Sequence, residues 1–225
     1  FKSNAGCVNI FDDASFTLNK GDIACILGES GVGKSTLLKI IGGMMKKDRG
    51  NIFVDGKEIK EVFSKDRINT FGYIFQSHCL LPEFTIQENL YLPLIIANKE
   101  IKKNKEKINY YLDKFFLYDK RKSYPIELSD GQCQRISIIR AILNDPKIIL
   151  ADEPTGNLDK NNSELILELF VKLNEELDKI FIIATHDMKV KNISNKIFEI
   201  NNMKVNLIKD EWKLYKRCTK IIKVR

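Results

Sequence analysis

The sequence predicts an α/β fold whose central β-sheet is mostly parallel, and three stretches carry this prediction. Residues 22–28, DIACILG, form an apolar run that enters a glycine-rich loop, and apolar residues recur at helical spacing after it. Residues 147–153, KIILADE, and 179–187, KIFIIATHD, are β-branched apolar runs that end in acids or histidine. Such runs are typical of strands buried on both faces of a parallel sheet. Residues 160–177 between them have the helical period, which gives a β-α-β unit.

The other elements follow in chain order. Residues 50–56, GNIFVDG, are typical of a strand closed by an Asp-Gly turn, and residues 71–75, FGYIF, of another strand. We interpret residues 85–118 as helices broken by the charged patch NKEIKKNKEK. KIFEI and KVNLI near the end indicate two more short strands. The chain has 225 residues, which suits one sizeable α/β domain or two small ones.

The composition is that of a folded protein whose excess charge lies at one end. Hydrophobic residues make up 44% of the chain, which allows a real core. The formal net charge is +7, but from Lys204 onward there are eight basic and only two acidic residues, so the rest is nearly neutral. Compositional drift toward lysine is our preferred explanation of the basic tail, and a weak attraction to anionic lipid is the alternative. The run from Leu90 to Ala97, which only Pro93 interrupts, is far shorter than the ~18 residues of a membrane span.

The cysteines, histidines and lysines argue against several kinds of site. Five cysteines are scattered without a CxxC pair, which predicts reduced thiols in a cytosol-like compartment. We interpret Cys79 and Cys133 as structural or incidental, because neither has a catalytic partner. His78 and His186 lie far apart in the sequence, which disfavours a two-histidine metal site. The lysines at 102–107 suit a solvated helix face, and without interleaved aromatic residues they do not predict nucleic-acid binding.

The stretch GESGVGKST, residues 28–36, predicts a phosphate-binding loop. It matches GxxxxGK[ST] between a predicted strand and a predicted helix, and a chance match on an ordinary turn is the alternative. Glycines let backbone N–H groups close round a phosphate, and the helix N-terminus adds a favourable field. Lys34 is placed to reach the β- and γ-phosphates, and Ser35 to ligate Mg²⁺. The loop residues expected to bind the nucleotide are Gly28, Glu29, Ser30, Gly31, Val32, Gly33, Lys34, Ser35 and Thr36.

Two acids at the end of the predicted strand IILADE add to the loop. Asp152 is placed to hold Mg²⁺, directly or through water. Glu153 beside it can polarise an attacking water as a general base. An ordinary acidic strand end is the alternative interpretation. The loop alone is compatible with a kinase, a GTPase or an ATPase. A Mg²⁺ ligand and a general base beside the loop reduce the number of these classes that fit.

Four further features give the chain its resemblance to a known family. They are ELSDGQCQRISIIRAIL (127–143), Gln76 after a predicted strand, DEPTGNLD (152–159) and ATHD (184–187). In this order and spacing, the sequence resembles the ATP-binding-cassette (ABC) ATPases over essentially the whole chain. The resemblance implies a P-loop NTPase fold, with a RecA-like and mostly parallel core, an antiparallel β subdomain and an inserted α-helical subdomain. It also implies a single domain, with the catalytic core at 1–76 and 145–208, the helical subdomain at 77–144 and a basic tail at 209–225.

The same resemblance implies roles for individual residues. Ser129, Gly131 and Gln132 belong to the signature motif, which would complete the ATP site of a second subunit. Gln76 would lie near Mg²⁺ and the water, His186 would contact the γ-phosphate, and Asp159 would link the two sites of a homodimer. Phe1 falls where the family stacks an aromatic residue on adenine, although a stray aromatic at a frayed end is a near-equal alternative. The expected catalytic residues are therefore Glu153, His186 and Gln76, the expected cofactors ATP and Mg²⁺, and the expected Mg²⁺ ligands Ser35, Gln76 and Asp152.

One position departs from the usual signature LSGGQ, because Asp130 replaces its first glycine. Aspartate tolerates unusual backbone angles better than most residues, so the turn can survive. A carboxylate that faced the γ-phosphate would repel it, whereas one that pointed away would leave the motif intact. We expect the second arrangement.

The segment after Gln76, SHCLLPEFTIQENLYLPLI (77–95), looks most like the ATPase subunit of lipoprotein-releasing transporters. The pattern is shared with macrolide-exporter and cell-division ATPases, which remain alternatives. The resemblance implies a homodimer on ATP binding, separate integral membrane subunits, no nucleic-acid partner and a peripheral position at the cytoplasmic face of the inner (plasma) membrane. Two other classes stay open: a soluble ABC ATPase without a transporter, and a nucleotide-binding module that no longer hydrolyses ATP.

Overall fold

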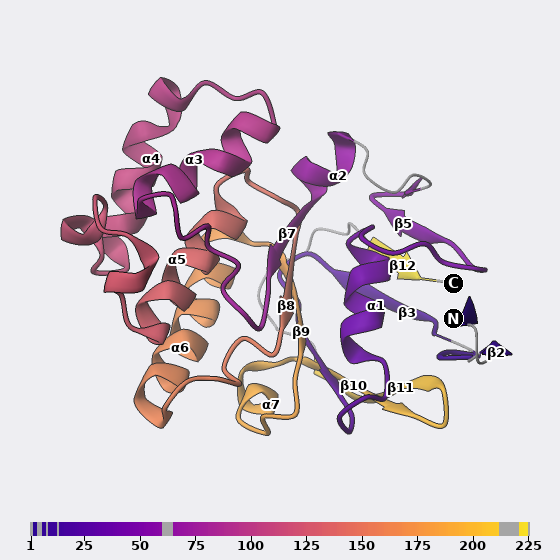
Figure 1. The fold of residues 1–225 in the computed structure, drawn as a ribbon. Helices are drawn as coiled ribbons and strands as arrows, with labels where there is room; N and C mark the ends of the chain where they lie inside the picture. Colours follow the sequence, from indigo (N-terminus) through magenta and orange to yellow (C-terminus); the bar gives the residue numbers. More distant parts are fainter. Residues whose placement is uncertain are drawn as a thin grey trace.

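The computed structural model describes residues 2–3, 6–7, 9–12, 14–59, 65–211 and 221–224 of the chain. Among these residues, a six-stranded sheet lies between helices and a four-stranded sheet lies to one side of it (Figure 1). A short pair, β1 (Lys2–Ser3) and β2 (Gly6–Cys7), stands apart as a third sheet. The helices gather mainly on the side away from the four-stranded sheet.

The large sheet has the strand order β11-β10-β4-β9-β8-β7. Its strands are β4 (Ile23–Leu27), β7 (Phe71–Ile74), β8 (Ile148–Asp152), β9 (Ile180–Ala184), β10 (Lys196–Asn201) and β11 (Lys204–Asp210). Neighbours pair in parallel except β10 and β11, which are antiparallel. Every residue of β4, β8 and β9 is buried, which explains their nearly continuous apolar sequences. The predicted α/β class with a mostly parallel sheet is confirmed.

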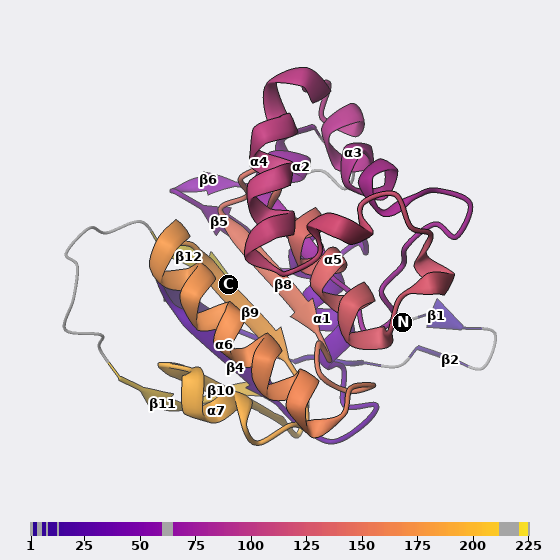
Figure 2. The same cartoon turned by 90° about the vertical axis from the view of Figure 1, so that its left-hand side faces the viewer.

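Helices cover both faces of this sheet. Side chains alternate along a strand, so Ile23, Cys25 and Leu27 of β4 join the core beneath α6 (Lys160–Leu177). Ala24 and Ile26 instead join the core beneath α1 (Lys34–Ile41). Figures 1 and 2 show α1 and α6 on opposite sides of the strands. The short helices α2 (Lys65–Thr70) and α7 (Val190–Ile193) precede β7 and β10.

The smaller sheet is antiparallel and has the order β3-β12-β5-β6. Its strands are β3 (Phe16–Asn19), β5 (Ile52–Val54), β6 (Lys57–Glu58) and β12 (Ile221–Val224). Strand β12 lies between β3 and β5, although the segment from residue 209 was expected to be a basic tail. The end of that segment thus supplies an inner strand, and its first two residues belong to β11.

A helical subdomain lies at one end of the sheet, at the upper left of Figure 1. It contains α3 (Ile86–Ile96), α4 (Ile101–Lys114), the short 3-10 helices η1 (Tyr118–Lys120) and η2 (Pro125–Glu127), and α5 (Asp130–Ile142). The helices break at residues 97–100, where the charged patch begins, but residues 101–107 of the patch are the first half of α4, so the predicted break is too long. None of the helices in the described ranges combines the length and apolar character that a membrane crossing requires.

Candidate active site

The glycine-rich loop joins the end of β4 to the start of α1. Gly33 caps α1 with φ 111° and ψ 8°, a left-handed backbone conformation that residues other than glycine rarely adopt. A Cβ atom at Gly33 would also lie 2.6 Å from Cγ2 of Ile10. Residues 28–33 therefore turn tightly from strand to helix, and Lys34, Ser35 and Thr36 form the first turn of α1. This is the strand-loop-helix context that the sequence predicted.

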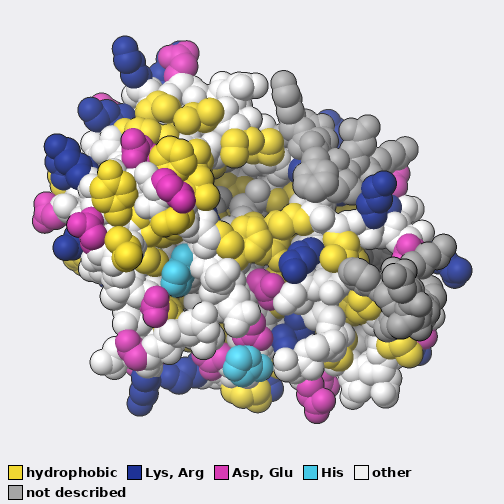
Figure 3. Space-filling view, in the orientation of Figure 1, with side chains coloured by type: hydrophobic (Ala, Val, Ile, Leu, Met, Phe, Trp, Pro, Cys, Tyr) yellow, Lys and Arg dark blue, Asp and Glu magenta, His cyan; other side chains and the backbone are white. Residues whose placement is uncertain are grey.

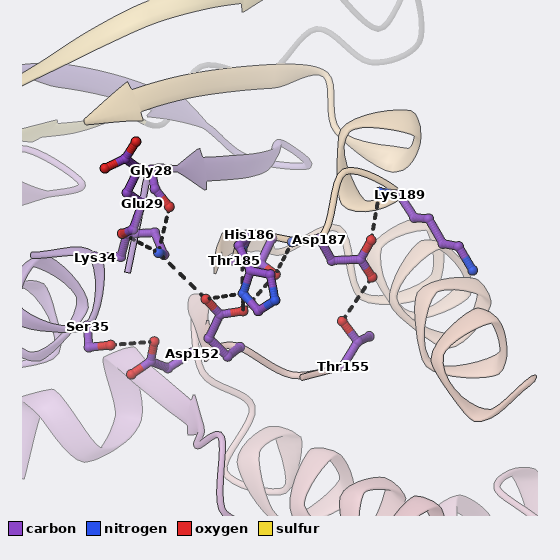
Figure 4. A network of polar contacts seen from close by, with 11 residues as sticks. Gly28, Glu29, Lys34, Ser35, Asp152, Thr155, Thr185, His186, Asp187 and Lys189 are labelled. Atoms are coloured by element: carbon purple, nitrogen blue, oxygen red, sulfur yellow. Dashed lines mark hydrogen bonds and ion pairs between the residues drawn. The ribbon is translucent and has the colours of Figure 1, made fainter. Parts of the chain in front are cut away.

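Lys34 crosses the loop and is almost fully buried (Figure 4). Its Nζ donates to the carbonyl oxygen of Gly28 at 2.8 Å and to that of Glu29 at 3.0 Å. The same nitrogen lies 3.6 Å from Oε1 of Glu153, which is at the end of another strand. The lysine charge thus points into the space between the loop and Glu153.

Ser35 and Asp152 form a second pair beside the loop. The Ser35 hydroxyl donates to Oδ1 of Asp152 at 2.9 Å. Burial raises the pKa of Asp152, although the bond from Ser35 opposes that shift. A hydroxyl and a carboxylate are oxygen ligands of the kind that Mg²⁺ prefers, so these side chains fit the ion that the sequence predicted.

Glu153 is held by the segment that follows β9. Its Oε2 accepts the Thr185 hydroxyl at 2.9 Å and the backbone N–H of His186 at 3.3 Å. The His186 ring nitrogen Nδ1 lies 3.0 Å from the Glu153 carboxylate. Glu153 itself has φ 45°, in the left-handed region. Lys34, Glu153 and His186 are thereby brought together at the carboxyl ends of neighbouring parallel strands.

The remaining predicted residues lie outside this group. Gln76 follows β7 and is exposed, with Nε2 3.7 Å from the place of a Cβ atom on Gly156. Ser129 caps α5 and pairs reciprocally with Gln132, while Asp159 caps α6 by accepting from Asn162 N at 2.9 Å. Within the described part of the chain, the hydrogen bonds of these side chains do not reach the loop at 28–36. Phe1 lies outside the described residues.

Two contacts at the site were absent from the sequence prediction. Thr185 fixes Glu153 through its hydroxyl, and Asp187 accepts from the Thr155 hydroxyl at 3.2 Å (Figure 4). Thr185 is fully buried, so a polar residue at the end of an apolar strand was the available signal. The contact between Asp187 and Thr155 joins segments that are distant in the sequence, and no comparable sequence pattern indicates it.

A phosphate loop between a parallel strand and a helix, facing acids at the end of a nearby strand, defines the class of P-loop nucleoside triphosphatases. The family model described as ABC transporter matches residues 11–156, and the chain belongs to this family. It is an ATP-binding protein and an ATP hydrolase of the ABC type.

Relatives extend this likeness over nearly the whole chain. The lipoprotein-releasing system ATP-binding protein LolD of Buchnera aphidicola subsp. Acyrthosiphon pisum (strain APS) is 42% identical over 210 residues, 91% of this chain and 92% of that protein. The ABC transporter ATP-binding protein YtrE of Bacillus subtilis (strain 168) is 41% identical over 199 residues, 87% of this chain and 86% of that protein.

Solved structures of the ATP-binding cassette MJ0796 have the same fold. Its dimeric post-hydrolysis state bound to ADP and Pi matches with a TM-score of 0.83 and 32% identity, over 93% of this chain and 94% of that one. A second dimeric structure of the same cassette matches with a TM-score of 0.84 at the same identity and coverage.

Proposed function

We propose that this chain is the ATPase subunit of a transporter that releases lipoproteins from the inner membrane. Family membership establishes the ATPase, and the cargo is inferred from the lipoprotein-releasing system protein that is 42% identical. The observation that carries the catalytic part is the convergence of Lys34, Glu153 and His186 at the loop. The segment 77–95 led to the same group from its sequence pattern.

In the proposed mechanism, Lys34 binds the β- and γ-phosphates of ATP after leaving the carbonyl oxygens of Gly28 and Glu29. Ser35, Asp152 and Gln76 would hold Mg²⁺, which would neutralise charge on the phosphates. Glu153 accepts the proton of the attacking water, and Thr185 keeps its carboxylate in place. His186 stabilises the charge that develops on the γ-phosphate.

The proposed active form is a homodimer with two shared sites. Ser129 is exposed at the start of α5, so a second subunit can reach it. Ser129, Gly131 and Gln132 would contact the ATP held by the partner's loop, and Asp159 would connect the two sites. The dimeric structures of MJ0796 support this arrangement, since that cassette is 32% identical to this chain.

A membrane subunit would dock on the helical subdomain. Hydrophobic side chains gather over this part of the molecule (Figure 3). The most exposed are Phe116, at 83%, and Ile126, at 90%, and Leu81, Phe84, Ile95 and Ile96 add to them. Exposed apolar patches mark interaction sites, and a partner that crosses the membrane would hold this chain at the cytoplasmic face. A nucleic-acid partner forms no part of the proposal.

Reconstitution tests the proposal. The purified chain, reconstituted with the membrane subunits of a lipoprotein-releasing transporter, should hydrolyse MgATP faster than alone and should release a lipoprotein from proteoliposomes. EDTA should stop both reactions. ATP turnover without lipoprotein release would contradict the proposed cargo and favour a transporter of the macrolide-exporter or cell-division type. The Bacillus subtilis relative, at 41% identity, is described only as an ABC transporter ATP-binding protein.

A further inference from the structure

The side chain of Gln134 on α5 joins two segments that flank the active site. Its Nε2 donates to the carbonyl oxygen of Pro154 at 2.9 Å, and its Oε1 lies 2.8 Å from Nδ1 of His78. Gln134 is only 1% exposed, so these bonds are shielded from water. A carbonyl oxygen can only accept, which fixes the orientation of the amide and makes Nδ1 of His78 the donor.

Each of the joined segments carries a residue of the proposed mechanism. His78 lies two residues after Gln76, and Pro154 directly follows Glu153. The backbone N–H of Glu153 is also bonded, to the carbonyl oxygen of Ala184 at 2.8 Å. We call residues 76–79 the glutamine segment. The side-chain amide of Gln134 thus connects this segment to Pro154, the residue after the proposed general base.

A second contact fastens the glutamine segment to the same helix. Arg140, six residues further along α5, donates from Nη2 to the carbonyl oxygen of His78 at 2.7 Å. Its Nη1 donates to the carbonyl oxygen of Cys79. His78 is therefore held through both its ring and its backbone, and a movement of the glutamine segment must move α5 or break these bonds.

We propose that His78 and Gln134 are positioning residues that fix the glutamine segment relative to Glu153. Two hydrogen bonds in series, from His78 to Gln134 and from Gln134 to Pro154, set the distance between Gln76 and Glu153. A displacement of the glutamine segment by a docked membrane subunit then reaches the general base by this route. The inference rests on the proposed function for the role of Gln76 and Glu153.

The other ring nitrogen of His78 faces a different residue. Nε2 lies 3.7 Å from Oδ1 of Asp130, which is too long for a hydrogen bond, and the Asp130 side chain is 77% exposed. We therefore attribute the positioning role of His78 to Nδ1. A test must distinguish the contribution of Nδ1 from that of Nε2.

Two substitutions of similar shape make that separation. The amide of His78→Asn can replace Nδ1 as a donor to Gln134, whereas His78→Leu has nearly the same outline and no polar atom. Both variants remove Nε2. We expect His78→Leu to lower kcat of the full-length protein with MgATP about tenfold, with the KM for ATP changed less than about twofold, which corresponds to about 1.4 kcal/mol in the barrier. His78→Asn should keep at least about half of the wild-type kcat, and Cys79→Ala, on the same segment, should match wild type.

Two results would overturn the inference. Equal losses in His78→Leu and His78→Asn would assign the effect to Nε2 or to packing, and an unchanged His78→Leu would show that the bond has no role. If His78→Leu does not melt cooperatively, Gln134→Met supplies the second measurement, and the expected result is the same fall in kcat. These outcomes are read from basal turnover ratios, so they are independent of whether membrane subunits stimulate the enzyme or which cargo is released.

Discussion

Glu153 has the most contacts of any predicted catalytic residue, with Thr185, His186 and Lys34 all directed at its carboxylate. Glu153→Gln preserves the shape of the side chain and removes its basicity, so the water would no longer lose its proton efficiently. We expect kcat to fall at least ~100-fold, within the range for loss of a general base, while ATP still binds. Steady-state turnover and a fluorescent-ATP titration measure the two effects separately.

Lys34→Ala supplies the contrast for that experiment. It deletes the charge that faces the phosphates, so it should weaken ATP binding itself as well as lower turnover. Loss of binding in Glu153→Gln, or wild-type affinity in Lys34→Ala, would contradict the roles assigned to these two residues.

Asp130 gives a second prediction at this scale. Its carboxylate is largely exposed and lies 3.7 Å from Nε2 of His78. That it points away from the γ-phosphate bound by a partner stays a prediction. Asp130 is also the first residue of α5, where a negative charge favours the helix by a few tenths to ~1 kcal/mol. Asp130→Gly should therefore change ATPase activity less than about threefold, under ~0.7 kcal/mol in the barrier. A gain of tenfold or more would mean that the carboxylate opposes closure of the dimer.

At the scale of elements, Asn89 of α3 holds the loop that precedes the helix. It is fully buried, accepts from Leu81 N at 2.8 Å and donates to the carbonyl oxygens of Leu81, Phe84 and Thr85. Asn89→Ala would remove these bonds, and with them the Asn89 partner of the buried Leu81 N–H. We expect the free energy of unfolding to fall by about 1–3 kcal/mol. Urea denaturation measures this change.

Asn104 on α4 offers a matched control. Its side chain donates a hydrogen bond to the carbonyl oxygen of Glu100 at 2.9 Å. Asn104→Ala should cost less than about 0.5 kcal/mol. Equal losses of stability in the two variants would contradict the stabilising role assigned to the buried contacts of Asn89.

Elements could be predicted where the sequence pattern is local. The apolar runs of β4, β8 and β9 predicted buried strands, and the helical period of 160–177 matches the bounds of α6. The first half of α4 was missed because its buried residues, such as Ile108, come later, while its lysines face solvent or distant groups. Lys107, for example, donates to the carbonyl oxygen of Leu143 on another part of the subdomain. The residues next to Lys107 in the sequence do not indicate such a partner.

Strand β12 was missed for a related reason. Its partners, β3 and β5, lie near the other end of the sequence, so the strand depends on non-local pairing. The same limit applies to the candidate site. Motif spacing indicated that Lys34, Ser35, Asp152 and Glu153 would come together, and their proposed roles stay predictions. The bond between His78 and Gln134 depends on how α5 packs, and no motif encodes it.

At the scale of the whole molecule, the proposed ATP site needs two copies of the chain. The signature residues of one subunit do not bond to its own loop, so their proposed ligand is the ATP of the partner. Charge-assisted hydrogen bonds from Ser129 and the backbone of Gly131 to the γ-phosphate would hold the two subunits together. Because ADP lacks that phosphate, dimerisation should depend on which nucleotide is bound.

Light scattering on purified Glu153→Gln protein tests this claim most directly, since the variant should bind ATP without consuming it. With MgATP the measured mass should be that of a dimer, and with MgADP mostly that of a monomer. Ser129→Arg in the same background should prevent the ATP-dependent dimer. A monomer with ATP bound, or a stable dimer with both nucleotides, would contradict the shared-site account.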